Sequence, residues 1–262
     1  MSNSLHRIVI VGGGAGGLEL ATRLGHRLGR TQRARITLVD AVLTHVWKPL
    51  LHEVAAGSMD SEANEVNFRA HARRHGYEFQ LGRMESLDRQ RQEIMLAPIC
   101  DEAGEPVVGE RRVPYDTLVI AVGSTANDFG TPGAREHCLF LDSLQQARRF
   151  HQLLLNAFLR SNYQVDPAGQ TPALRIAIVG AGATGVELAA ELRLASRLLP
   201  VYGLDQLRPK DVEIHVIEAA ERILPALPER LASSALRELG RLDIQVHTGN
   251  PVAEVTADGF TL

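Results

Sequence analysis

The sequence has little of several features that define specialised classes of protein. Only two of its 262 residues are cysteines, Cys100 and Cys138, and they form no C-x-x-C pair. Two distant cysteines are too few for a disulfide scaffold, a zinc knuckle or a thioredoxin-like redox pair. We therefore expect two free thiols in a reducing compartment.

Charge and apolar runs exclude further classes. The 28 basic and 31 acidic residues leave a formal net charge of −3, which argues against a nucleic-acid-binding protein and against a polybasic membrane patch. No apolar run reaches the roughly 18 residues of a membrane span, and the polar first residues do not resemble a signal peptide. The composition predicts a cytoplasmic protein.

What the sequence does contain is an internal repeat. Residues 7–24 and 175–192 are identical at 12 of 18 aligned positions. Each copy has the pattern of a buried parallel strand, a G-x-G-x-x-G turn and a helix. A second strand then ends in an acid, at Asp40 in the first copy and at Glu218 in the second. Two copies do not make a solenoid, so the repeat predicts two related domains.

Each glycine of the motif has a physical role. The first makes the tight turn, the second lets backbone N–H groups approach a pyrophosphate, and the third lets helix and strand pack closely. The pyrophosphate then lies at the helix N-terminus, where unpaired N–H groups favour an anion. The glycines in these roles are, in order, Gly12, Gly14 and Gly17 in the first copy and Gly180, Gly182 and Gly185 in the second.

The acid after the second strand accepts hydrogen bonds from ribose hydroxyls. Asp40 lies 23 residues after Gly17, whereas Glu218 lies 33 residues after Gly185. The extra length falls at 198–210, where Pro and Gly mark an inserted loop. An acid instead of an arginine at position 218 favours NADH over NADPH, because it repels a 2′-phosphate.

These patterns predict an α/β fold with two Rossmann-like dinucleotide-binding domains, at 1–128 and 129–262. Further elements are expected outside the two repeats. They are strands at 77–88, 92–96 and 115–123, a helix opened by a capping box at Ser143, a polar linker at 162–173, a helix over 229–239 stopped by Gly240, and short strands at 244–247 and 253–255.

Four stretches carry a family resemblance. They are IVGGGAGG at 10–17, HVWKPLLHEVAAG at 45–57, VPYDTLVIAVG at 113–123 and VGAGATGVELAAE at 179–191. With these, the chain resembles the pyridine nucleotide–disulfide oxidoreductase superfamily of two-dinucleotide flavoproteins. Within it, the chain is most similar to the type II (alternative) NADH:quinone oxidoreductases. The second stretch discriminates best, because other branches place redox cysteines near it and this sequence has none there.

The resemblance implies domains of the FAD/NAD(P)-binding type, with FAD at the first repeat and NADH at the second. The ten histidines show no metal-ligand spacing, so we expect no metal site. Lys48 is then expected near the flavin, and Glu187 is expected to face nicotinamide, flavin and quinone, as the two catalytic residues. The implied FAD contacts are Gly12, Gly14, Ala15, Gly16, Gly17, Asp40, Lys48, Ala121, Gly123 and Ser124, and the implied NADH contacts are Gly180, Gly182, Thr184, Gly185, Glu187 and Glu218.

Local alternatives stay open for both catalytic candidates. Lys48 has an alternative interpretation as an ordinary surface lysine. Glu187 has one as a first-turn acid favoured by the helix dipole, as Glu19 has in the first copy. Val122 replaces the threonine that the family carries between Ala121 and Gly123, which removes a hydroxyl contact and leaves the backbone role intact.

The implied activity is hydride transfer from NADH to flavin and electron transfer onward to a membrane quinone, as in a respiratory NADH dehydrogenase that pumps no protons. Family members continue beyond the NADH domain to complete the FAD domain and a membrane-docking region. We therefore expect the N-terminal part of a peripheral enzyme at the cytoplasmic face of the inner membrane, with a homodimer left open. The alternatives are a ferredoxin reductase-like or sulfide:quinone oxidoreductase-like flavoenzyme, or a truncated nucleotide-binding module without turnover.

Overall fold

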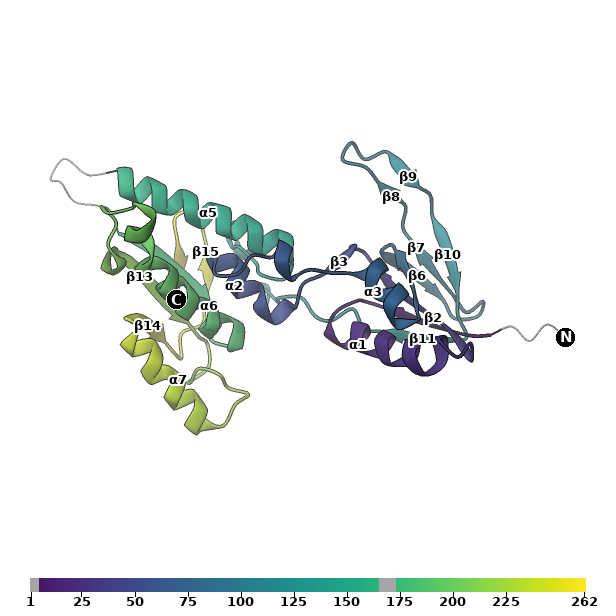
Figure 1. The fold of residues 1–262 in the computed structure, drawn as a ribbon. Helices are drawn as coiled ribbons and strands as arrows, with labels where there is room; N and C mark the ends of the chain where they lie inside the picture. The colour runs from purple at the N-terminus through teal and green to yellow at the C-terminus, as the bar shows by residue number, and fades with distance from the viewer. Residues whose placement is uncertain (1–4, 165–172) are drawn as a thin grey trace. The chain divides into compact units, whose positions relative to one another are not determined.

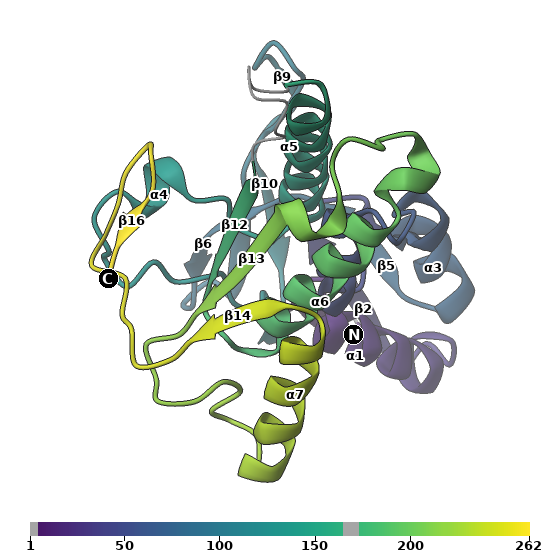
Figure 2. The ribbon, with the colours of Figure 1, turned by 90° about the vertical axis from the view of Figure 1, so that its left-hand side faces the viewer.

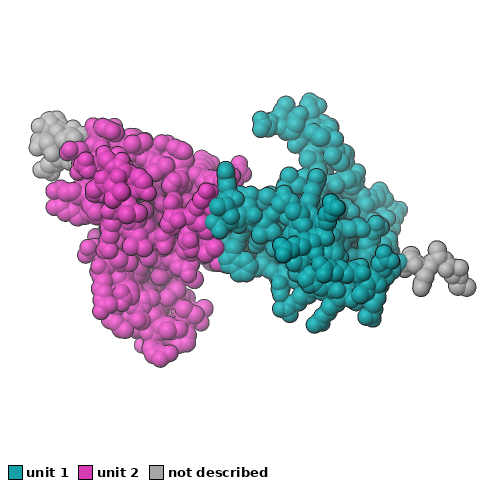
Figure 3. Space-filling view, in the orientation of Figure 1, with its two compact units in different colours: residues 1–48, 62–124 teal, residues 49–61, 125–262 magenta. Residues whose placement is uncertain are grey.

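The computed structural model describes residues 5–164 and 173–262, which form two compact units. Unit 1 comprises Met1–Lys48 and Glu62–Ser124, and unit 2 comprises Pro49–Ser61 and Thr125–Leu262 (Figure 3). The chain therefore passes between the units three times. The single boundary expected at 128/129 differs from this division, because the segment 49–61 contains a short helix, α2 (Leu51–Ala56), that packs within unit 2.

A parallel sheet forms the centre of unit 1 (Figure 1). Its strand order is β11-β1-β2-β5. Side chains alternate between its two faces, so that Ile10 points to one face and Val9 and Val11 point to the other. Both faces are covered, so the two inner strands carry apolar residues on both sides, at Ile8–Val11 in one and at Leu38 and Val39 in the other. The strands are β1 (His6–Val11), β2 (Ala34–Asp40), β5 (Glu78–Leu81) and β11 (Thr117–Ile120).

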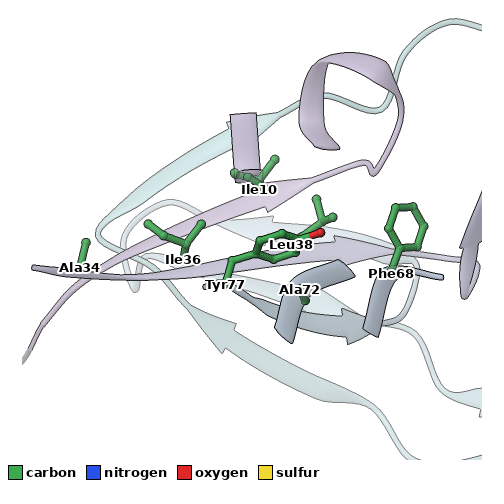
Figure 4. Close-up of a cluster of buried hydrophobic side chains, with 8 residues drawn as sticks. Ile10, Ala34, Ile36, Leu38, Phe68, Ala72 and Tyr77 are labelled. Atoms are coloured by element: carbon green, nitrogen blue, oxygen red, sulfur yellow. The ribbon is translucent and has the colours of Figure 1, made fainter. Parts of the chain in front are cut away.

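Two helices, α1 (Ala15–Leu24) and α3 (Phe68–His75), cover the first face. A π-helical turn at Gly25–Gly29 extends α1. Asn67 caps α3 by accepting a hydrogen bond from the Ala70 N–H at 3.1 Å. The core on this side combines strand and helix side chains (Figure 4), namely Ile10, Ala21, Ala34, Ile36, Leu38, Phe68, Ala72 and Tyr77.

A second, antiparallel sheet of order β10-β7-β6 covers the opposite face. The stretch expected as one strand at 77–88 is divided between the two sheets. The division occurs at Gly82, whose N–H donates to the Asp40 carbonyl at 2.8 Å and turns the chain from one layer to the other. The strands are β6 (Met84–Asp88), β7 (Glu93–Leu96) and β10 (Arg111–Pro114), with the short pairs β3 (Thr44–His45) with β4 (Val66–Asn67) and β8 (Ile99–Cys100) with β9 (Pro106–Val108).

Unit 2 repeats the parallel arrangement. Its sheet has the order β12-β13-β14 (Figure 2), and α6 follows β12 directly after the second glycine motif. The expected α/β fold with two Rossmann-like units is confirmed. The elements are β12 (Leu174–Val179), α6 (Ala183–Arg197), β13 (Val212–Ile217), α7 (Glu229–Arg241) and β14 (Ile244–His247), followed by the hairpin of β15 (Glu254–Val255) and β16 (Phe260–Thr261).

The expected capping box is present at the start of α5 (Leu144–Tyr163). The Ser143 hydroxyl accepts from the Gln146 N–H at 3.2 Å, and the Gln146 side chain accepts from the Ser143 N–H at 3.1 Å. Most of the linker expected at 162–173 lies outside the described residues. The last expected helix, α7, includes Gly240 and ends one residue later, at Arg241. A short helix, α4 (Ala134–His137), precedes α5.

The inserted loop between α6 and β13 is anchored by buried polar groups. Arg193 donates to the carbonyls of Pro209 at 2.6 Å and Asp243 at 3.0 Å. Asn162 accepts from the backbone N–H groups of Gln206 and Leu207 at 3.0 and 3.2 Å. Burial lowers the pKa of the Arg193 guanidinium. The loop is thus an ordered part of unit 2, with 3-10 turns at Leu199–Tyr202 and Pro209–Asp211.

Among the described helices, none combines the length and the apolar character that a membrane crossing requires.

An ion pair joins the ends of β1 and β11. The Arg7 guanidinium donates to both carboxylate oxygens of Asp116, at 2.8 and 3.1 Å, and the Arg7 backbone N–H donates at 2.7 Å. These hydrogen bonds, those of the guanidinium first, hold the pKa of Asp116 well below its usual range.

We expect Asp116→Asn to lower the melting temperature at neutral pH, because the neutral amide loses the attraction of Arg7. A carboxyl with a lowered folded-state pKa stabilises the fold above its unfolded-state pKa and loses that contribution as pH falls through the folded value. The difference between wild type and variant should be full at neutral pH and shrink below about pH 4. Thermal melts across this range measure it, with Glu105→Gln in the β8–β9 turn as control. A pH-independent difference would contradict the assignment.

Candidate nucleotide-binding sites

The two glycine loops have the same backbone geometry. Gly12 and Gly180 have φ values of +103° and +105°, in the region that favours glycine. The N–H of Gly12 donates to the Val39 carbonyl at 2.8 Å, and the N–H of Gly180 donates to the Ile217 carbonyl at 2.8 Å. Each loop is therefore fixed to the end of the neighbouring second strand.

The acid at the end of the second strand is bound in the same way in both units. One oxygen of Asp40 accepts from the Gly13 N–H at 2.5 Å and the other accepts from the Val42 N–H at 3.0 Å. In unit 2, Glu218 accepts from the Ala181 N–H at 2.7 Å and from the Ala220 N–H at 2.9 Å. An ionised carboxylate has about four acceptor positions, so each acid retains capacity for ribose hydroxyls.

The third glycine is required by close packing. A Cβ on Gly17 would overlap the Gly12 carbonyl oxygen, and a Cβ on Gly185 would overlap the Gly180 carbonyl oxygen. Gly14, Gly16 and Gly182, by contrast, have no atom within 4 Å of an added Cβ. The loop is thus closely packed at its third glycine and open at the glycines that would face a pyrophosphate.

The helix N-termini above these loops suit an anion. The first bond of α1 runs from the Leu18 N–H to the Gly14 carbonyl at 2.9 Å, and that of α6 runs from the Val186 N–H to the Gly182 carbonyl at 3.1 Å. The preceding N–H groups therefore point out of the helix end without intrahelical partners. Ala15 and Gly16 on α1 and Thr184 on α6 are exposed there. This donor set fits a dinucleotide in each unit.

The first glycine loop has a neighbouring segment that the second loop lacks. The Ala121 N–H donates to the Val11 carbonyl at 2.7 Å, and Ala121 and Val122 lie directly against Gly12. The segment then turns at Gly123, which has φ +74° and open space around it. The structure thus places the predicted residue Ala121 against the first glycine loop, and Gly123 and Ser124 follow it in the chain. Gly180 has no such neighbour.

Lys48 lies at a crossing point of the chain. Its Nζ donates to the Ser124 carbonyl at 2.7 Å. Lys48 and Ser124 are the last residues of the two segments of unit 1. The lysine therefore joins the stretch at 45–57 to the residue that directly follows the stretch at 113–123.

Glu187 lies in the first turns of α6 and is half-exposed. Its Oε2 is 3.5 Å from Nδ1 of His52, a buried histidine on α2 (Leu51–Ala56). Sequence reasoning did not find this pair, because 135 residues separate its members (187 − 52). In the part of the chain that the structure describes, no group of three or more His, Cys, Asp or Glu side chains could hold a metal ion.

Two further residues lie near the first glycine loop, and the sequence did not predict them there. The Phe68 ring lies against Gly13, where an added Cβ would overlap it, and His45 lies near the same ring at a centroid distance of 6.1 Å. Burial lowers the pKa of His45, and the charge of Asp40 opposes that shift. Only the asparagine cap before Phe68 marks this site in the sequence, and it indicates a helix start without showing which loop the helix supports.

Comparison with known proteins agrees with this geometry. Residues 6–262 match the family described as pyridine nucleotide-disulphide oxidoreductase. The chain belongs to this family. The resemblance to type II enzymes is also confirmed: the chain is 43% identical to the type II NADH:quinone oxidoreductase of Haemophilus influenzae, over 97% of this chain and 61% of that relative.

Solved structures share the fold. NDH2 from Plasmodium falciparum in complex with NADH matches with a TM-score of 0.82 at 21% identity, covering 98% of this chain and 50% of that one. The sulfide:quinone oxidoreductase of Aquifex aeolicus matches with a TM-score of 0.70 at 17% identity, covering 96% and 52%. The chain thus spans about half of these structures and 61% of the Haemophilus relative.

The glycine packing gives a matched pair of variants. We expect Gly17→Ala to destabilise the protein by about 1–3 kcal/mol, the usual cost of overpacking, because its Cβ would overlap the Gly12 carbonyl. Gly16→Ala, one residue earlier in open space, should instead stabilise α1 by roughly 0.5–1 kcal/mol. Urea unfolding of both variants measures the difference, and equal stabilities would show that the loop does not pack as described.

Proposed function

We propose that this chain is the nucleotide-binding part of a type II NADH:quinone oxidoreductase, with FAD in unit 1 and NADH in unit 2. One observation carries the proposal: the duplicated glycine loop, bound twice to the acid at the end of the second strand. The identity with the Haemophilus relative supports the choice of this branch.

FAD is assigned to unit 1. The open backbone at Gly14, Ala15 and Gly16 would face its pyrophosphate, and the spare acceptor positions of Asp40 would face its ribose. The segment Ala121–Ser124, against the same loop, would line the flavin side. Lys48 holds that segment through the Ser124 carbonyl, which supports its placement near the flavin.

NADH is assigned to unit 2. Gly180, Gly182 and Gly185 would cradle the pyrophosphate at the start of α6, beside Thr184, and Glu218 would accept from the ribose. The negative charge of Glu218 would repel the 2′-phosphate of NADPH. Glu187, half-exposed in the first turns of α6, would face the reacting end of the dinucleotide.

When both cofactors are bound, they supply hydride transfer from nicotinamide to flavin and electron transfer onward to an acceptor. The residues of this chain bind, orient and shield the two dinucleotides. A quinone acceptor, as in the name of the Haemophilus relative, supports a site of action at a membrane surface. Membrane docking and a homodimer stay predictions.

Flavin absorbance tests the proposal directly. The purified chain, reconstituted with FAD, should show a visible flavin spectrum that bleaches on anaerobic addition of NADH and returns when a soluble quinone is added. A protein that binds no FAD would overturn the assignment of unit 1. A stable flavin spectrum that NADH does not change would favour the alternative of a nucleotide-binding module without turnover.

The two acids allow the cofactor assignment to be tested separately. We expect Asp40→Asn to weaken FAD binding without changing the ratio of NADH to NADPH affinity. Glu218→Gln should shift that ratio toward NADPH by about tenfold, or about 1.4 kcal/mol, and leave FAD binding intact. Titration of each variant with FAD, NADH and NADPH measures this. The reverse pattern would exchange the cofactors between the units.

A further inference from the structure

A short helix carries one buried polar side chain into unit 2. Helix α2 packs against α5 and α6. All of its residues except Glu53 are buried, and it ends at Gly57 with φ +85°. His52 is 8% exposed, and its Nδ1 is buried without a hydrogen bond. A buried ring nitrogen without a partner costs free energy, so a hydrogen-bond acceptor near Nδ1 would stabilise this position.

Glu187 meets that requirement. Its Oε2 lies 3.5 Å from Nδ1, slightly beyond a good hydrogen bond, and its side chain is 50% exposed. The ion pair that the structure gives for His52 is the one with Glu187. On the adjoining helix α5, Arg148 donates to the Ser61 hydroxyl at 2.9 and 3.1 Å, and His151 lies against Gly57.

We propose that His52 is a positioning residue for Glu187. The Nδ1–H donates to Oε2 and fixes the carboxylate, so that its other oxygen faces the dinucleotide at the start of α6. This inference rests on the proposed function and deepens it, because it assigns the orientation of Glu187 to a side chain from a distant part of the sequence. The ring nitrogen that carries the proton is set by the hydrogen bond that it makes.

A spectroscopic test of the pair needs no bound nucleotide. In the full chain labelled with ¹⁵N-histidine, at a pH above the ordinary histidine range, His52 should carry its proton on Nδ1. Glu187→Met, at a half-exposed position where the fold tolerates change, should move the proton to Nε2. Glu191→Gln, one turn further along α6, is the control and should leave the tautomer unchanged. The same tautomer in wild type and Glu187→Met would overturn the proposal.

Nucleotide affinity tests the consequence. His52→Leu, which fills the buried space with an apolar side chain but has no hydrogen-bond donor, should weaken NADH binding about fivefold. His52→Asn, whose amide nitrogen occupies the place of Nδ1, should restore most of that loss. His151→Leu, on α5, should have no effect on NADH affinity. In the Glu187→Met background, His52→Leu should add nothing further, because the two residues act as one unit.

Failure of this proposal can be distinguished from failure of the proposed function. Equal NADH affinities for His52→Leu and His52→Asn, or additive losses in the double variant, would reduce His52 to a packing residue and overturn the proposal. If the wild-type chain bound no NADH, the proposed function would fail, and the tautomer measurement would still decide whether His52 holds Glu187.

Discussion

In each unit, a carboxylate at the end of the second parallel strand accepts a hydrogen bond from a backbone N–H of the glycine loop. Asp40 does so from Gly13, and Glu218 does so from Ala181. This hydrogen bond joins the ends of two neighbouring strands. Because it fixes the glycine loop, it also fixes the position and direction in which the following helix begins. The open side of the glycines, the exposed N–H groups and the spare carboxylate positions then form one surface, which no single residue could provide.

Much of this arrangement could be predicted because it is local in the sequence. The strand, the turn, the helix and the acid lie within 34 residues in the first copy (7–40) and 44 in the second (175–218). The spacing of their glycines and apolar residues therefore indicates their geometry directly. The capping box at Ser143 and Gln146 is equally local, since its two hydrogen bonds span three residues. The single strand expected at 77–88 failed at Gly82, because alternation alone does not show that a chain changes sheet.

The features that could not be predicted depend on contacts between distant segments. Phe68 lies against Gly13, Arg193 anchors an insertion and His52 faces Glu187. None of these side chains differs in type from its sequence neighbours in a way that indicates its role. The role depends on the distant residue that it contacts in the folded chain. A lone histidine in an apolar stretch carries no periodic pattern that names its partner. The placement of α2 in unit 2 escaped prediction for the same reason, since its own residues indicate only a short apolar helix.

Helix α2 also sets an order of events during synthesis. Its residues leave the ribosome long before those of α5 and α6, with the rest of unit 1 made in between. Until those helices exist, the apolar side chains of α2 have no partner surface in unit 2. These side chains are Leu51, Val54, Ala55 and Ala56. Contacts between such distant segments form late, and the exposed segment is open to wrong pairing in the meantime. The second unit can therefore be completed only when a part made early returns to it, and a fragment that began after residue 128 would lack the helix that closes its core.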